Sequence, residues 1–148
     1  MDRMIPTVIR CTDEARLLRF LETIDTTLPV PLSARVELLS FLRTNLERGY
    51  AFAIEDEKGE LACAAIFYYH FRKETAAYLD LMATVPAYCG RGYAGAVMDA
   101  MEAAAKKDGM REFHLHTNDT NTAALSLYSK RGYRIIAHDP KVHMKKEL

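Results

Sequence analysis

The stretch that decides the fold runs from Val85 to Met98 and reads VPAYCGRGYAGAVM. Pro86 ends a β-rich run, and glycines at positions 90 and 92 lead into a segment whose apolar residues have helical spacing. Glycine lets backbone N–H groups approach a ligand closely, and the first turn of a helix has unpaired donors at the positive end of its dipole. This pattern suits a diphosphate. It is equally compatible with a strand-to-helix turn that needs glycine only for its dihedral angles.

Gly90, Gly92 and Gly95 form a literal G-x-G-x-x-G, so a dinucleotide-binding turn has to be considered. That fingerprint opens a repeating parallel βαβ unit and has an acidic residue about 20 positions later, at the end of the next strand. Here Glu112 begins the next predicted strand, and the turn follows a run of consecutive strands. The context therefore argues against a dinucleotide site. A Walker-type phosphate loop is also excluded, because no Gly-Lys-Ser/Thr follows.

Outward from this turn, the spacing of apolar residues gives the element order β-α-α-β-β-β-α-β-α-β-β. The first two helices are expected to begin at the N-caps Thr12 and Ser33. The other helices are expected at 93–107 and 122–131, and the strands at 5–10, 51–54, 61–71, 75–85, 112–117, 133–137 and 142–145. The segment 61–71 is apolar on both alternating faces, which predicts a central strand. This order predicts an α/β (α+β) fold, with a mixed central sheet of six to seven strands flanked by about four helices.

Length and composition fit one domain, which we expect to span residues 1–148. Hydrophobic residues make up 49% of the chain, enough for a core without a metal or disulfide. Twenty basic side chains balance twenty acidic ones, which argues against nucleic acid or anionic lipid as a partner. The three cysteines are widely spaced without zinc-site spacing, and the N-terminus has no signal-peptide pattern. We therefore expect a cytoplasmic protein that has no metal site and does not enter a membrane.

A second motif, NTAALSLYSKRGY, runs from Asn121 to Tyr133. Together with PAYCGRGYAGAVM it resembles the two core motifs of the GNAT superfamily of N-acetyltransferases, and the predicted element order matches that fold across nearly the whole chain. The family's first motif reads Arg/Gln-x-x-Gly-x-Gly/Ala, to which Cys89, Gly92 and Ala94 correspond. Cys89 departs from this pattern. Because the family binds the cofactor pyrophosphate chiefly through backbone amides, we expect the change to affect cofactor affinity more than the fold.

The resemblance implies acetyl-coenzyme A as the cofactor. Arg91 would be available to a phosphate, and Asn121 matches a position that contacts the cofactor, although it is equally placed to cap its helix. The turn residues implied in pyrophosphate binding are Cys89, Gly90, Arg91, Gly92, Tyr93 and Ala94. The acetyl carbonyl oxygen is expected to be held by backbone N–H groups in the preceding strand, at Met82, Ala83 and Thr84. Divergence of that strand from the strand at 112–117 is what would admit the pantetheine arm in such a fold.

Tyr128 matches the family position whose tyrosine protonates the sulfur of coenzyme A. A phenol with a pKa of about 10 stays protonated at neutral pH, while a free thiol titrates near ~8.5. The alternative is that Tyr128, four residues after Ala124, only forms the rim of an apolar helix face. With both motifs present, we favour the acid role.

Asp80 is the only charged residue between Glu74 and Arg91, in an otherwise apolar strand that ends beside the turn. An acceptor amine resembling lysine has a pKa of about 10.4, so at neutral pH it needs a base, or a water chain serving as one. The family often has a carboxylate on this strand, and burial would make Asp80 a stronger base. A structural carboxylate paired with an arginine or a helix end is the competing explanation. His70 and His116 are second choices for the base.

These features lead us to interpret the chain as an acetyl-CoA-dependent N-acetyltransferase. It would pass an acetyl group to a primary amine of a small molecule or peptide by direct attack in a ternary complex, with Tyr128 and Asp80 as catalytic residues. One alternative is an acyltransferase that uses another acyl-CoA or a protein amine. Another is a non-catalytic acyl-CoA-binding or regulatory module, which Cys89 favours and the retained Tyr128 and Asn121 argue against. The sequence leaves a homodimer open.

Overall fold

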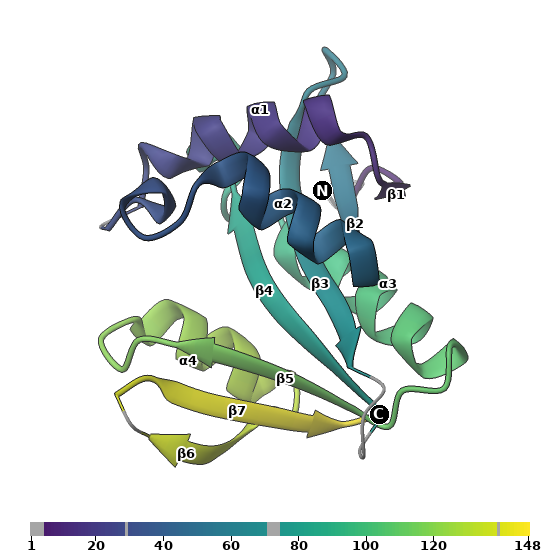
Figure 1. Ribbon diagram of the computed structural model, residues 1–148, viewed down its shortest axis with the longest axis vertical. Helices are drawn as coiled ribbons and strands as arrows, with labels where there is room; N and C mark the ends of the chain where they lie inside the picture. Colours follow the sequence, from purple (N-terminus) through teal and green to yellow (C-terminus); the bar gives the residue numbers. More distant parts are fainter. Residues whose placement is uncertain (1–4, 29, 71–74, 139) are drawn as a thin grey trace.

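The computed structural model describes residues 5–28, 30–70, 75–138 and 140–148, whose strands form a seven-stranded sheet (Figure 1). The strand order is β1-β2-β3-β4-β5-β7-β6, and every neighbouring pair is antiparallel except β4 and β5. The strands are β1 (Val8–Cys11), β2 (Gly49–Glu55), β3 (Leu61–His70), β4 (Ala76–Thr84), β5 (Glu112–Thr117), β6 (Arg134–His138) and β7 (Val142–Glu147). The predicted mixed sheet is confirmed.

Helices cover both faces of this sheet. Two pack against β2 and β3 on the face turned to the viewer in Figure 1, which we name the front face, and two pack on the opposite, back face. The front helices are α1 (Glu14–Asp25) and α2 (Leu38–Arg48), the back helices are α3 (Tyr93–Lys107) and α4 (Thr122–Lys130), and two short 3₁₀ helices are η1 (Leu32–Ala34) and η2 (Pro86–Tyr88). No helix lies in front of β5 and β7 among the described residues (Figure 1).

β3 lies at the centre of the core because its alternate side chains enter two separate apolar clusters. Ile66 packs in the front cluster with residues of α1 and α2, and Phe67 packs in the back cluster with residues of α3. A strand covered on both faces needs apolar residues at every position, which explains why this segment shows no polar alternation. The prediction of a central strand is confirmed. Phe71, its predicted last residue, lies outside the described residues.

β4 and β5 pair over only part of their lengths. The parallel ladder joins Ala76–Leu79 of β4 to Glu112–Leu115 of β5 and then stops, although β4 continues to Thr84 and β5 to Thr117. We name the region beyond the last pair the fork. No described strand pairs with the edge of β4 that faces the fork, so its backbone groups there are available to another partner.

A β-bulge in β4 lies directly at the fork. Leu79 pairs with Phe67 and Leu81 pairs with Ile66, so Asp80 is an extra residue with no opposite partner on β3. Because of this extra residue, Tyr78 and Leu81 both belong to the front face although they are three positions apart. The bulge therefore places Asp80 at the point where β4 and β5 separate.

Two helix starts differ from the sequence prediction. Asp13, not Thr12, caps α1, because its side chain accepts a hydrogen bond from a backbone N–H in the first turn at 3.2 Å. Glu37, not Ser33, precedes α2 and caps it in the same way, while Ser33 lies in η1. Several neighbouring residue types can cap a helix, so the sequence alone does not select among them. In the part of the chain that the structure describes, no helix has the length and apolar character needed to cross a bilayer.

Gly49 at the start of β2 allows a close approach to β3, which leads to a test of the sheet. A Cβ at this position would lie 1.9 Å from the backbone oxygen of Phe67. We expect Gly49→Ala to lower the free energy of unfolding by about 3 kcal/mol, measured by urea titration. Gly109→Ala is the control, because nothing lies within 4 Å of its added Cβ and only a φ of 92° opposes it. The control should lose about 1–2 kcal/mol, and equal losses in the two variants would contradict the close approach.

Candidate functional site

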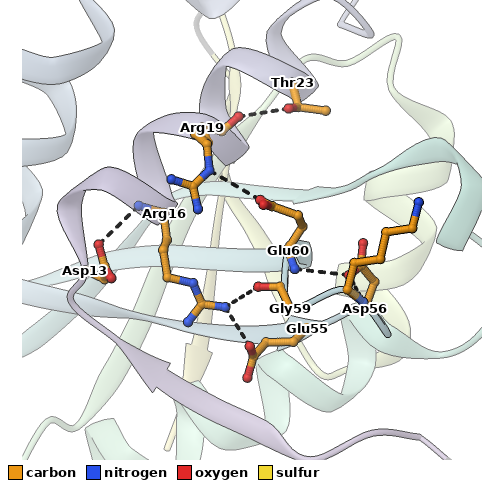
Figure 2. Close-up of polar contacts among 9 residues, drawn as sticks. Asp13, Arg16, Arg19, Thr23, Glu55, Asp56, Gly59 and Glu60 are labelled. Atoms are coloured by element: carbon orange, nitrogen blue, oxygen red, sulfur yellow. Dashed lines mark hydrogen bonds and ion pairs between the residues drawn. The ribbon is translucent and has the colours of Figure 1, made fainter.

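α1 fixes the β2–β3 hairpin through two arginines (Figure 2). Arg16 donates to the Glu55 carboxylate at 2.7 Å and to a carbonyl oxygen of the hairpin turn at 2.6 Å. Arg19 Nε lies 3.4 Å from the Glu60 carboxylate, and Asp56 closes the turn by accepting hydrogen bonds from two backbone N–H groups. These contacts hold the hairpin tip in place beside the segment that follows β4.

Tyr88 connects the hairpin to the glycine-rich turn. Its hydroxyl donates to the Glu57 carboxylate at 3.2 and 3.3 Å, and its ring stacks on Tyr93, the first residue of α3, with 6.1 Å between ring centres. The Arg91 guanidinium lies 4.9 Å from the centre of the Tyr88 ring. Loss of solvent, reinforced by Glu57, raises the pKa of Tyr88 above its ordinary value, so the hydroxyl remains a donor. Both ends of the turn are therefore anchored.

Gly90 and Gly92 give the turn its shape. Their φ angles are 77° and 81°, in the left-handed region that favours glycine. α3 begins at Tyr93, and no side chain forms a cap on its first turn. The sequence prediction of a strand, a glycine turn and a helix from 93 to 107 is confirmed.

The turn presents a row of backbone donors. The first hydrogen bond of α3 runs from Ala96 N–H to the Gly92 oxygen at 3.2 Å, and the N–H groups of residues 90–95 have no partner within the described chain. The N–H of Cys89 is already used, since it donates to the Pro86 oxygen at 3.2 Å. Unpaired N–H groups at the positive end of a helix attract an anion. The row therefore fits a diphosphate, beginning at position 90 and not at 89.

β4 offers further donors at the fork. Val85 N–H donates to the Ala62 oxygen at 2.8 Å, and bonded and non-bonded residues alternate along an antiparallel pair. The N–H of Ala83 is therefore directed to β3, whereas those of Met82 and Thr84 point away from β3 toward the fork. Two of the three N–H groups expected to hold an acetyl oxygen thus face the opening.

Tyr128 lies on the back side of the sheet, in α4. The helix begins at Asn121, whose Oδ1 accepts a hydrogen bond from Ala124 N–H at 3.1 Å. The Tyr128 side chain is 8% exposed, and its hydroxyl makes no hydrogen bond to a described residue. Burial raises the pKa of Tyr128 to about 12, which keeps the phenol protonated. Asn121 is therefore a helix cap, and its contact with a cofactor stays a prediction.

A buried carboxylate behind Tyr128 was not predicted. Glu102 of α3 is 8% exposed and accepts hydrogen bonds from the Tyr133 hydroxyl at 2.9 Å, Lys146 Nζ at 2.9 Å and Arg131 Nη2 at 3.2 Å. The Tyr133 ring meets Tyr128 edge-on at 5.8 Å. The sequence signal was a lone glutamate next to Met101 on the apolar face of a helix. This network fixes the end of α4 against α3.

Asp80 does not have the burial that its apolar strand suggested. The residue is exposed, and its Oδ2 accepts a hydrogen bond from Asn45 Nδ2 of α2 at 2.9 Å. Asn45 is itself buried, donates also to the Phe41 oxygen at 3.0 Å, and has an Oδ1 without a hydrogen-bond partner among the described residues. The partner of Asp80 is therefore an amide, and not the arginine or helix end of the competing explanation.

Three histidines lie together on the front face of β5 and β7. His114 Nδ1 is 2.8 Å from His143 Nε2, His114 Nε2 is 2.9 Å from Glu112 Oε1, and the His116 ring stacks on His143 at 4.3 Å. Among the described residues, no group of three or more His, Cys, Asp or Glu side chains is arranged so that it could hold a metal ion. The sequence analysis named His116 but missed His114 and His143. His70, its other second choice, lies on β3, with its ring 6.1 Å from Tyr78.

The sequence of one strand could have revealed two of these three histidines. Residues 114 and 116 share a face because they are two apart on one strand. His143 joins them only through the pairing of β5 with β7, which places it directly opposite His116. Alternation along one strand predicts the first two side chains, whereas the third depends on a long-range register.

Comparison with known proteins decides the family. The model of the acetyltransferase (GNAT) family matches residues 17–133, more than half of the chain. The chain belongs to the GNAT acetyltransferase family. The match includes the fork, the glycine turn and Tyr128 and ends before β7, so His143 lies outside it. No curated protein matches the GNAT chain significantly.

Solved structures support the same fold. An acetyltransferase of the GNAT family from Staphylococcus aureus Mu50 is 14% identical, with a TM-score of 0.79 over 96% of this chain and 98% of that one. The ribosomal-protein-S18-alanine N-acetyltransferase from Escherichia coli is 20% identical, with a TM-score of 0.76 over 95% and 92%. A chain of the NatC complex bound to Gag peptide and CoA is 16% identical, with a TM-score of 0.76 over 98% and 99%. At these identities the likeness shows the GNAT fold.

The Glu102 network gives a test of how α4 is held. Glu102→Ala would leave the Tyr133 hydroxyl, Arg131 and Lys146 without their shared acceptor, so we expect a loss of about 3 kcal/mol in urea unfolding. Asp99→Ala is the matched control, because Asp99 also binds Arg131 but its side chain is 74% exposed. The control should lose less than about 1 kcal/mol. Similar losses in both variants would show that the buried network does not hold the helix.

Proposed function

We propose that the chain transfers an acetyl group from acetyl-CoA to a primary amine of a small molecule or peptide by direct attack in a ternary complex. The observation that carries this proposal is the row of unpaired N–H groups at 90–95 in a chain of this family. Tyr128 supports it, because it packs in the same apolar cluster as Leu79 and Leu115, the last paired residues before the fork.

The chain's own groups suit a bound acyl-CoA. The N–H groups of 90–95 would hold its diphosphate, with Arg91 released from the Tyr88 ring to reach a phosphate. The N–H groups of Met82 and Thr84 would hold the carbonyl oxygen, where negative charge develops during acyl transfer. Asn121 would add a contact from the start of α4. Once bound, acetyl-CoA supplies the thioester, whose carbonyl carbon the amine attacks.

Tyr128 would act as the acid. A departing thiolate needs a proton, and a phenol that keeps its proton until the pKa of about 12 remains available as the donor throughout the neutral range. Its position in the apolar cluster excludes bulk water, which strengthens a hydrogen bond to the leaving sulfur. Tyr128 and α3 both lie on the back face, so the acceptor would reach the fork from the front.

Asp80 stands on that front side. It accepts a hydrogen bond from α2 and is exposed at the fork, so a cationic amine would meet its carboxylate there. The alternative of a purely structural carboxylate is distinguishable by experiment. We assign Asp80 the role of holding the amine, since its exposed carboxylate can pair with a cationic ammonium group at the fork.

The names of two similar structures bear on the acceptor class. Two of the similar structures carry names that refer to a ribosomal protein alanine and to a Gag peptide, which favours including peptide amines in a screen. A screen of primary amines for thiol release from acetyl-CoA, alongside the rise in melting temperature on adding acetyl-CoA, tests the function. Longer acyl-CoA thioesters in the same assay test the choice of acyl group.

A non-catalytic acyl-CoA-binding module is the second candidate, and Cys89 is the observation that favours it. A long arginine or glutamine side chain is missing there, and the thiol lies near the Thr84 and Val85 oxygens at 3.8 and 3.9 Å. A binding module would show the thermal shift with acetyl-CoA but release no thiol with any amine. An enzyme shows both.

The acid role gives a direct prediction. We expect Tyr128→Phe to lower kcat about 100-fold while leaving the Kd of acetyl-CoA unchanged, because only the proton donor is lost. The pKa of about 12 means that this loss should be constant between pH 6 and 9, since Tyr128 stays protonated across that window. Steady-state kinetics and calorimetric titration measure the two effects. Wild-type turnover in the variant would remove Tyr128 from the acid role.

The role of Asp80 is tested with its partner. Asp80→Asn should raise the KM of a cationic acceptor about fivefold, the effect of losing one partly exposed charge, and leave the KM of acetyl-CoA unchanged. Asn45→Ala keeps the charge and removes only the hydrogen bond, so its acceptor KM should change less. A structural role predicts the opposite pattern, in which both variants lose stability equally and neither changes the acceptor KM.

A further inference from the structure

The three histidines form a built array and not a chance cluster. His114 is buried, and both of its ring nitrogens are engaged, one by Glu112 and one by His143. Its ring also stacks on Tyr78 of β4 with 4.8 Å between centres. Lys145 Nζ lies 3.1 Å from Oε2 of Glu112, so the carboxylate that holds His114 is itself held by an ion pair. The array therefore has fixed positions.

Hydrogen-bond chemistry settles the tautomers. The pKa of Glu112 is lowered, first by the hydrogen bond from His114 and then by Lys145, so Glu112 is a carboxylate and His114 Nε2 carries the proton. In neutral His114 the Nδ1 is then an acceptor, and His143 must donate to it through Nε2–H. Both rings are thereby held in fixed orientations behind His116.

His116 is the member of the array that can react. It is the first β5 residue beyond the last β4–β5 pair, and its ring nitrogens make no hydrogen bond to a described residue. It is exposed, and its stacking on His143 places it on the front face, the side from which the acceptor would arrive. Asp80 lies across the fork within electrostatic reach of it. His116 is therefore a free imidazole at the fork.

The surroundings keep His116 neutral near pH 7. Although the residue is exposed, partial loss of solvent by its ring lowers the pKa of His116 first, followed by Lys141 and His114, while Asp80 acts in the opposite direction. The pKa of His143 is lowered first by partial loss of solvent and then by His116, His114 and Lys145, so charge on one of the two stacked rings disfavours charge on the other. Among the described residues, the charged and titratable groups around the array lie on four strands: Tyr68 and His70 on β3, Tyr78 and Asp80 on β4, Arg111 and Glu112 at β5, and Lys141, His143, Lys145 and Glu147 at β7. An unprotonated imidazole is available as a base under these conditions.

We propose that His116 takes the proton from the acceptor amine, and that His143, His114 and Glu112 are positioning residues that hold its ring at the fork. This inference rests on the proposed acetyl transfer. It assigns proton acceptance to His116 and leaves Asp80 to hold the ammonium and then to stabilise the imidazolium across the fork. His116 thereby becomes a catalytic residue, because it touches the reacting amine.

The proton balance is complete with these groups. One proton passes from the ammonium nitrogen to a ring nitrogen of His116, which leaves the amine lone pair free. As the new C–N bond forms and the C–S bond breaks, Tyr128 gives its proton to the sulfur. The nitrogen of the new amide then loses one of its two remaining protons, which passes through water to the Tyr128 phenolate and restores the hydroxyl. His116 releases its proton to solvent.

A pair of probe amines isolates this step. A peptide with a blocked N-terminus and one free lysine has an amine pKa of about 10.4, whereas a peptide with a free N-terminus and no lysine has one of about 7.7–8.0. His116→Gln should lower kcat/KM about 100-fold at pH 7 for the lysine peptide and less for the other peptide, which is partly deprotonated already. The loss should shrink as pH rises. The control His138→Gln, an exposed β6 histidine bound to Asp119, should match wild type.

Substitutions at His143 test the positioning role. His143→Phe keeps a ring for His116 to stack on, while His143→Gln keeps a hydrogen-bond donor for His114 and removes the ring. We expect the Phe variant to stay within about threefold of wild-type kcat and the Gln variant to lose about tenfold, with acetyl-CoA KM unchanged in both. Wild-type kcat in both variants would overturn the positioning role.

Nuclear magnetic resonance separates this inference from the proposed function. In protein with ¹⁵N-labelled histidine, long-range ¹H–¹⁵N correlation at pH 8 should show Nε2–H tautomers for His114 and His143, and a titration should place the His116 midpoint below its ordinary value. Acetylation of the lysine peptide at wild-type rate by His116→Gln, or an equal loss for both peptides, overturns the inference alone, as does a protonated His116 at pH 7. Absence of thiol release with every amine overturns both.

Discussion

The short parallel seam between β4 and β5 is the constraint on which the site depends. β4 stays paired with β3 up to Thr84, and β5 stays paired with β7 up to Thr117, yet the two share a ladder of only four residue pairs. The sheet is thus two antiparallel units, β1 to β4 and β5 to β7, joined along one short edge. Each strand follows its own antiparallel partner, which accounts for the separation beyond Leu79 and Leu115.

This separation gives the two faces of the sheet different chemistry at one place. On the back, the apolar cluster around α3 contains Tyr128 and excludes water. On the front, polar and aromatic side chains, His116 among them, line β5 and β7 where no described helix covers them, and the exposed Asp80 of β4 lies beside α2. A group inserted at the fork would be in contact with both environments. The same backbone divergence therefore brings together Tyr128, the proposed proton donor, in an apolar setting and His116, the proposed proton acceptor, in a polar one.

The sequence predicts those parts of the site that depend on local chemistry. The glycine turn, the helix from 93 to 107 and the placement of Tyr128 on α4 all follow from spacing, turn residues and the motifs. The fork does not, because the end of a ladder is a property of two distant segments. For the same reason the partner of His114 is not predictable from β5 alone. The exposure of Asp80 is not predictable from its strand either, because the bulge that contains it depends on pairing with β3.

The bulge also makes β4 sensitive to its own length. Its two parts are out of phase with each other, since Tyr78 and Leu81 share a face across an odd interval. Removing one residue between them would remove the bulge and restore strict alternation, with both parts keeping their faces. Removing one residue elsewhere in β4 would instead make all side chains and amides beyond that point exchange faces. Exchanging one side chain for another leaves this phase intact. Insertions and deletions outside the bulge are therefore far more disruptive than replacements, and the number of residues along this strand is a stricter structural constraint than its composition.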